Sequence, residues 1–180
     1  MGGGFRDFFV VIAESAATLI GLLFVAVTVV RGRSEDQSKQ IGEFRAAASL
    51  LAFTNALVVS LYGLVPGNGF GYPTFIMGVI GILFAAAGVR TTLAQPVRQQ
   101  RRWHQLLLIL GLLAVFGVQI VYGLRLISHP GSRDALEIVG DVLIASLLLG
   151  IGRAWELVGA WNASMFSSIR YIVGRGGPPS

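Results

Sequence analysis

The sequence predicts an all-α, polytopic integral membrane protein with about five transmembrane helices, and three observations support this prediction. Residues 8–30 form an apolar run whose only charged residue is Glu14, and a helix of this length crosses a hydrocarbon core of about 30 Å. The composition is 54% hydrophobic and only 13% charged, whereas soluble domains contain about 25% charged residues. Further apolar runs follow, separated by clusters of turn-forming residues.

The apolar runs and the turns between them predict a single transmembrane domain over residues 1–180. The expected spans are residues 8–30, 46–65, 70–89, 104–125 and 135–152. Turns are expected where proline and glycine interrupt the hydrophobic pattern, at residues 66–69, 95–96 and 129–132. The second and fifth spans carry more polar residues than the others, so their limits are the least sharply marked.

The distribution of basic residues predicts how the helices are oriented in the membrane. Eleven of the 14 lysine and arginine residues fall within residues 31–45, 90–104 and 153–175, which lie on one side of a five-span topology. Cytoplasmic loops carry an excess of basic residues. We therefore expect the amino terminus outside and the carboxyl terminus in the cytoplasm, with the protein in the inner membrane of a bacterium.

After the fifth span, residues 153–173 change in character. Polar residues recur there at spacings of three and four, as on an amphipathic helix. The segment is either a helical extension of the fifth span on the cytoplasmic side or a helix lying in the interface. The extension is favoured for its first half, because no strong helix breaker occurs there. Residues 174–180, rich in glycine and proline, are expected to be a disordered tail.

The composition also narrows the possible chemistry. The chain has no cysteine and only two histidines, His104 and His129, both outside the central apolar stretches, so we expect no metal site and no cofactor. No nucleophile motif and no phosphate-binding loop is present, so we expect no enzyme activity. The net charge of +5 comes from residues flanking the spans, which indicates the lipid bilayer as partner and not a nucleic acid.

Several spans carry small residues four positions apart, as Gly81 and Ala85 do on the third, a spacing that allows close helix contact in lipid. The same spacing relates Ala13, Ala17 and Gly21 on the first span, and Ser146, Gly150 and Ala154 on the fifth. They either pack helices within one subunit or build an interface between subunits. The first span is the better candidate for an interface, because its small residues lie beside Glu14.

Polar side chains within the spans are the candidate functional residues, because such groups are costly in lipid. They are Glu14, Thr18, Asn55, Gln119 and Asp141. Counting helical rise from the expected outer boundary places Glu14, Gln119 and Asp141 at a similar depth. Thr18 lies one turn after Glu14 on the same helix face, so its hydroxyl could bond the carboxyl group or continue a polar path.

Two interpretations of these residues remain open from the sequence. In the structural one, Asp141 forms an ion pair with Arg125, and Glu14 is neutral or bonded to Gln119. In the functional one, Glu14, Thr18 and Asp141 line a water-filled route, where carboxylates at one depth favour cations.

The leading functional hypothesis is a homo-oligomeric, channel-like conduit for small ions, in which Glu14 sets the charge preference. Five spans do not divide into two matching repeats, and one subunit of this size is too small to surround a wide path, so several copies would assemble. The alternative hypothesis is a non-catalytic accessory or scaffolding subunit of a larger membrane complex, which other membrane proteins would surround. The two hypotheses differ in what covers the first span.

Overall fold

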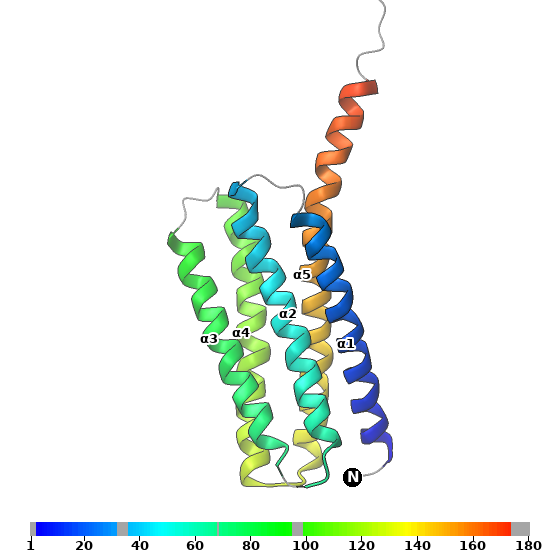
Figure 1. Cartoon of the computed structure of the whole chain (residues 1–180). Helices are drawn as coiled ribbons and strands as arrows, with labels where there is room; N and C mark the ends of the chain where they lie inside the picture. Colours follow the sequence, from blue (N-terminus) through cyan, green and yellow to red (C-terminus); the bar gives the residue numbers. More distant parts are fainter. Residues whose placement is uncertain (1–2, 32–35, 68, 95–98, 174–180) are drawn as a thin grey trace, which may run out of the picture.

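The computed structural model of the chain is an all-helical bundle and describes residues 3–31, 36–67, 69–94 and 99–173. Side-chain surroundings are described for residues 4–28, 46–67, 69–90 and 109–155. The helices are α1 (Gly3–Arg31), α2 (Asp36–Leu64), α3 (Gly71–Ala94), α4 (Gln99–Ser128) and α5 (Arg133–Val173) (Figure 1).

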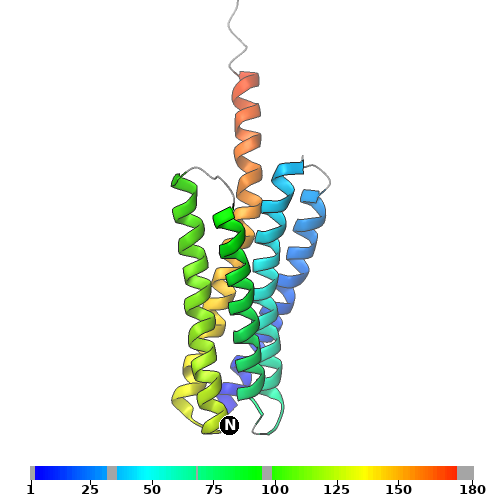
Figure 2. The ribbon, with the colours of Figure 1, turned by 90° about the vertical axis from the view of Figure 1, so that its left-hand side faces the viewer.

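The helices run alternately up and down, so α1, α3 and α5 all begin at the same end, which we call the amino-terminal end (Figure 1). The most extensive contacts join α3 to α4, α1 to α2 and α2 to α5. Helix α1 makes its main contacts with α2 and α5, on the side of the bundle away from α3 (Figures 1 and 2). One face of α1 is therefore left without a neighbour.

Each predicted apolar run lies within a helix, but the helices are longer than the runs. Helix α2 begins at Asp36, ten residues before the expected span, so much of the basic segment 31–45 is helical and not a loop. Beyond residue 152, where the sequence favours a helical extension of the fifth span, the same helix continues: α5 is unbroken from Arg133 to Val173 and projects beyond the other helices (Figure 1). The side chains beyond Trp155, the expected tail at 174–180 and the expected turn at 95–96 lie outside the described residues.

Two tight turns close the amino-terminal end of the bundle. Gly67, between α2 and α3, has φ +144°, and Gly131, between α4 and α5, has φ +97°. A side chain with a Cβ atom is strained in this region of φ, so glycine is the residue that suits both positions. Both turns lie where the sequence pattern predicts them, at 66–69 and 129–132.

The surface of the bundle is apolar, as expected for helices that face lipid. All five helices contain a segment long and apolar enough to cross a membrane. Large apolar side chains from every helix are exposed, among them Leu22, Phe24, Leu61, Ile76, Leu83, Leu110, Val121 and Leu148. Because helices satisfy their backbone hydrogen bonds internally, such a surface is stable in lipid and unstable in water. The chain is therefore a membrane protein with five candidate transmembrane helices.

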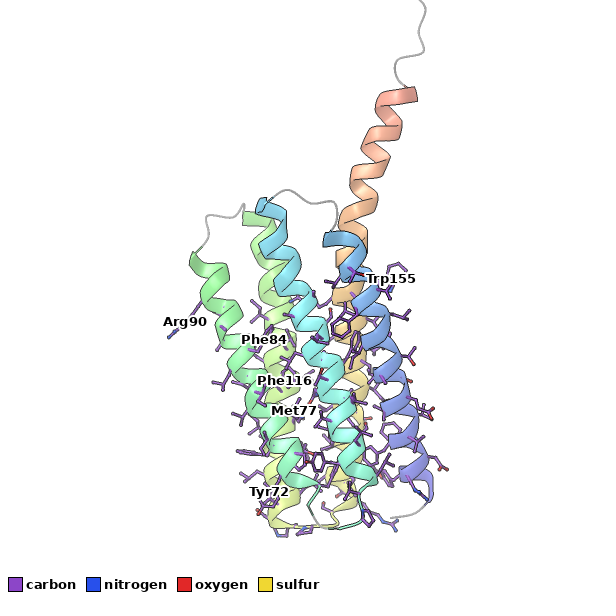
Figure 3. All side chains as sticks on the ribbon, viewed as in Figure 1. Tyr72, Met77, Phe84, Arg90, Phe116 and Trp155 are labelled. Atoms are coloured by element: carbon purple, nitrogen blue, oxygen red, sulfur yellow. The ribbon has the colours of Figure 1, made fainter. Side chains whose placement is uncertain are left out.

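Close packing of the bundle depends on glycines that face a ring or a backbone. A Cβ atom added to Gly81 of α3 would lie 2.2 Å from Cγ of Phe116, whose ring covers this position from α4. Phe116 is fully buried and points toward α3 and α2 (Figure 3). On α5, Gly150 similarly accommodates the ring of Phe53, whose Cε1 would lie 2.4 Å from an added Cβ. Small residues thus let the helices approach closely. This matters in lipid, because burial of apolar surface alone does little to drive helix association there.

Helix α1 is held by apolar contacts at the amino-terminal end. Phe9 is fully buried, and its ring lies 3.0 Å or less from the Cβ position of Gly63 on α2. The Phe9 ring also packs against Phe70, with a centroid distance of 5.3 Å, and against Phe8 at 5.6 Å. In the part of the chain whose side chains are described, no side-chain hydrogen bond joins α1 to another helix. Its docking therefore depends on shape and apolar contact.

Candidate functional site

A layer of hydrogen-bonded side chains crosses the middle of the bundle. The amides of Asn55 on α2 and Gln119 on α4 bond each other in both directions, from Asn55 Nδ2 to Gln119 Oε1 at 3.0 Å and from Gln119 Nε2 to Asn55 Oδ1 at 2.7 Å. Asn55 Nδ2 also donates to Ser146 Oγ on α5 at 3.2 Å, and Gln119 Nε2 to the carbonyl oxygen of Thr74 on α3 at 3.2 Å. The Ser146 hydroxyl donates to the Val142 carbonyl at 2.8 Å. We call these residues the polar layer.

Every amide hydrogen of Asn55 and Gln119 is used in the polar layer, since each nitrogen donates two bonds. Asn55, Gln119 and Thr74 are fully buried, and Ser146 is 1% exposed. A buried amide is costly when unpaired and inexpensive when all its bonds are made. The polar layer therefore joins α2, α3, α4 and α5, and it leaves no free donor to face a water-filled route.

Glu14 lies outside this interior. It is exposed on α1, and no described residue bonds its carboxylate. The Thr18 hydroxyl donates to the backbone oxygen of Glu14 at 2.9 Å and not to its carboxylate. Among the Asp and Glu residues whose side-chain surroundings are described, none is buried. The suggested bond between Glu14 and Gln119 is absent, because α1 turns the carboxylate away from the bundle.

Glu14 nevertheless lies level with the polar layer. Helices α1 and α5 run in the same direction, and an added Cβ on Gly140 of α5 would lie 3.3 Å from Phe8 of α1. Six residues further along both helices, position 14 is level with position 146, which carries the layer's serine. Glu14 is therefore near the level of the polar layer, on the face of α1 that is turned away from it.

Asp141 lies nearer the amino-terminal end than Glu14. It lines a cleft together with Phe5, Arg6 and Phe8 of α1, whereas Glu14 does not. The structure therefore gives the two carboxylates, expected at a similar depth, different surroundings. Asp141 is exposed and forms no ion pair with Arg125, whose Cζ lies 5.8 Å from the centroid of the Tyr122 ring. The cleft at this end has a volume of about 1390 Å³.

The exposed face of α1 has a regular polar and small-residue pattern. We call it the exposed seam, and its residues are Asp7, Val11, Glu14, Thr18, Gly21, Val25 and Thr28, all exposed. Their spacing alternates between four and three residues, which is the spacing of the contact positions in a parallel coiled coil. An added Cβ on Gly21 meets nothing within 4 Å. The seam thus combines interface spacing, an open glycine and an ionisable group.

The columns of small residues on α5 and α1 have different surroundings. On α5, Ser146 and Gly150 are buried within the subunit, and Ala154 packs against the same core. On α1, Ala13 is buried, whereas Ala17 and Gly21 are exposed. The α5 column therefore packs helices of one chain, and two members of the α1 column face outward.

Sequence reasoning brought out the polar residues but not their grouping. It named Asn55 and Gln119 for an ion path, whereas the structure pairs them with each other in the core. Arg133 and Glu137 line the cleft with Asp141, and their shared spacing of four residues is the sequence signal that places all three on one helix face. The contribution of Arg6 to the same cleft had no signal in the sequence, because α1 reaches it only through tertiary packing.

Chemically, the described polar residues offer hydrogen-bonding groups and charge. They contain no cluster of three or more His, Asp or Glu side chains that could hold a metal ion. Two surface features are candidate functional sites: the exposed seam with Glu14 and the charged cleft with Asp141. No protein-family model matches the chain, and no curated protein and no solved structure is significantly similar to it.

Proposed function

We propose that this chain is the subunit of a homo-oligomeric membrane conduit for small ions, with the path running between subunits and Glu14 setting its charge preference. The observation that supports this most directly is the position of Glu14, an unpartnered carboxylate on the open face of a transmembrane helix. An ionisable side chain facing lipid is strongly disfavoured. Contact with other copies, or with water held between them, removes that cost.

A path through one bundle is not supported by the packing. Phe53, Asn55, Phe116 and Gln119 are each at most 1% exposed and fill the middle of the bundle. The polar layer uses its amide donors internally. A route for ions is therefore better placed along the exposed seam.

Symmetry makes the exposed seam suitable for self-association. Copies inserted in one membrane with the same orientation have parallel α1 helices, and closed rings are the common arrangement of identical subunits. Every Glu14 then lies at one depth, in a ring of carboxylates. Such rings select cations in known channel architectures. We therefore expect the conduit to prefer cations over anions.

The orientation of the subunit is part of the proposal. The excess of basic residues near the α1–α2 and α3–α4 connections and after Trp155 supports a cytoplasmic location for that end of the bundle. The amino-terminal end would then face outward. The projecting part of α5 would be a cytoplasmic, amphipathic extension, in the inner membrane of a bacterium.

The experiment that tests the proposal is ion flux into sealed vesicles containing the purified full-length chain. Wild type should admit small monovalent cations faster than protein-free vesicles, and Glu14→Gln should reduce the cation preference by about tenfold, because one ring of charge is removed. Glu14→Asp should retain most of it. No flux by wild type above that of protein-free vesicles would overturn the proposal.

A matched control separates Glu14 from general surface charge. Asp7→Asn removes a carboxylate from the same seam, two helical turns nearer the end of the bundle. This variant should alter the cation preference less than Glu14→Gln does. Equal effects of the two variants would assign the preference to net surface charge and not to Glu14.

The accessory-subunit alternative is favoured by one observation, the part of α5 that projects past the other helices and is free to contact another protein (Figure 1). The native mass of the particle, extracted gently from its own membrane, separates the two functions. Several identical chains support the conduit. One or two copies held by unrelated chains support the accessory function, and removal of residues 160–180 should then release the partner.

A further inference from the structure

A broad cleft opens at the amino-terminal end of the bundle, away from the polar layer. Its volume is about 1390 Å³. The first turns of α1 and α5 form its walls, together with the α2–α3 connection and the end of α4. These segments lie where the candidate spans begin and end, so the cleft is at the boundary between lipid and water.

Four charged side chains line the cleft, and they balance in sign. Arg6 comes from α1, and Arg133, Glu137 and Asp141 come from one face of α5. All four are exposed, and no ion pair joins any two of them in the described structure. Opposite charges that share a cleft without pairing can bind a ligand that carries both signs.

The basic side chains are placed to hold an anion. Arg6 and Arg133 lie in the first turns of α1 and α5, and α3 begins at Gly71 in the same cleft. Helix amino termini carry partial positive charge and free backbone N–H groups, which favour phosphate and carboxylate groups. Arginine adds a planar set of donors suited to phosphate oxygens.

The acidic side chains are placed to hold a cation. Glu137 and Asp141 lie four residues apart on α5, so their carboxylates share one helix face. A primary ammonium has three N–H donors and can bond both carboxylates, whereas a quaternary ammonium has none to give. The cleft therefore favours a primary ammonium over a choline group.

The remaining lining is apolar and fits the less polar part of an amphiphile. Phe5, Phe8 and Phe70 lie along the cleft, together with Leu126 and Leu136. Phe8, Phe70 and the buried Phe9 form a packed aromatic cluster next to it. Ligand sites commonly combine such an apolar lining with a few convergent polar groups.

We infer that this cleft binds the headgroup of a zwitterionic lipid with a primary ammonium beside a phosphate, as in phosphatidylethanolamine. Arg6 and Arg133 hold the phosphate, Glu137 and Asp141 hold the ammonium, and the phenylalanines contact the glycerol region. The position of the cleft at the membrane boundary favours a lipid over a free zwitterion with the same chemistry. This assignment is independent of the proposed ion path, because it uses no residue of the exposed seam.

The test is a measurement of lipid binding to the full-length chain in detergent by native mass spectrometry. Phosphatidylethanolamine, phosphatidylcholine and phosphatidylglycerol with identical acyl chains are added in turn. Wild type should bind phosphatidylethanolamine about tenfold more tightly than either other lipid, since hydrogen bonds to charged groups distinguish them. The double variant Glu137→Gln, Asp141→Asn should lose this preference. Equal binding of the three lipids by wild type would overturn the assignment.

The matched control removes two carboxylates at the same end without touching the cleft. Asp7 and Asp134 are exposed, lie on the same two helices and do not line the cleft. The double variant Asp7→Asn, Asp134→Asn should keep the wild-type preference. If circular dichroism shows both double variants folded and both lose the preference equally, the cleft is not the site.

A second pair tests the phosphate half and identifies the source of the ligand. Arg6→Gln with Arg133→Gln should weaken both phosphatidylethanolamine and phosphatidylglycerol about tenfold, because both carry phosphate. Unchanged binding of both lipids would contradict the role of the two arginines. If soluble glycerophosphoethanolamine displaces the bound lipid, the headgroup alone is sufficient for recognition by the cleft. Failure of this compound to compete would support the lipid as the source.

Discussion

The interior formed by α2 to α5 and the exposed seam of α1 lie at a similar depth. They differ in whether their polar side chains are paired. In the interior, Asn55, Gln119 and Ser146 bond one another and are almost completely buried. On the seam, Glu14 has no described partner for its carboxylate. The polar groups of the interior are paired within the chain, whereas the carboxylate on the seam is exposed.

The glycines of the two regions show the same contrast. Gly81 faces the buried ring of Phe116, whereas Gly21 meets nothing. The structural role of a polar or small residue therefore cannot be inferred from its residue type alone in these helices. Its role depends on whether the face that carries it is closed by the same chain.

The largest expected effect comes from adding one methyl group to each kind of glycine. Gly81→Ala should lower the free energy of unfolding by about 2–3 kcal/mol, because the new Cβ collides with the Phe116 ring. Gly21→Ala should change it by less than about 0.5 kcal/mol. Denaturation by sodium dodecyl sulfate in mixed micelles, followed by circular dichroism, measures both. Equal losses would mean that the seam is closed within the subunit.

The next effect concerns the polar layer. Gln119→Leu should lower the free energy of unfolding by about 1–2 kcal/mol, because the Asn55 amide loses its partner inside the membrane. The double variant with Asn55→Leu should cost less than the two single variants added together. Thr18→Val on the seam is the control and should have little effect in the same assay. Additive costs would contradict the pairing of the two amides.

A bulky residue on the seam should affect association and not folding. Gly21→Leu should weaken self-association in lipid vesicles by about 1 kcal/mol, roughly fivefold, because small residues allow close helix contact. Energy transfer between labelled copies measures this. Gly152→Leu is the control, since Gly152 is also exposed and open but lies on α5. If both variants associate as wild type does, the seam is not the contact between copies.

The smallest expected effect is a difference in the free energy of unfolding between alanine variants of two buried serines. Ser60 Oγ has no hydrogen-bond partner among the described residues, whereas Ser146 Oγ accepts a bond from Asn55. Ser60→Ala should change the free energy of unfolding by less than about 0.5 kcal/mol or raise it slightly, since no bond is lost. Ser146→Ala should lower it by about 1 kcal/mol. The same denaturation assay compares them, and a larger loss for Ser60→Ala would indicate a partner that the polar layer does not include.

Much of the fold could be predicted from local patterns. The five apolar runs and the turns around Gly67 and Gly131 follow from composition alone, because lipid requires helices and helices require breaks. The helical residues of α2 that precede the second span could not be predicted in this way, since they are polar and carry no apolar signal. The continuity of α5 past Arg153 was only partly foreseen, because the sequence marks no break there.

The candidate sites were less accessible to sequence reasoning. The residues Glu14, Asn55, Gln119 and Asp141 stood out, because each is polar within an apolar run. Their separation into the polar layer, the exposed seam and the cleft could not be read from depth alone. The rotation of each helix about its axis and the packing of the helix ends decide that separation.

The sequence by itself determined that this chain is a helical membrane protein with five candidate spans, since length and hydropathy are local properties that lipid enforces. Only the tertiary structure decided which polar groups are paired inside and which are left on the surface. The physical reason is that pairing needs atoms from different helices within about 3 Å. Such contacts depend on helix rotation and register, as the amides of Asn55 and Gln119 and the open carboxylate of Glu14 illustrate.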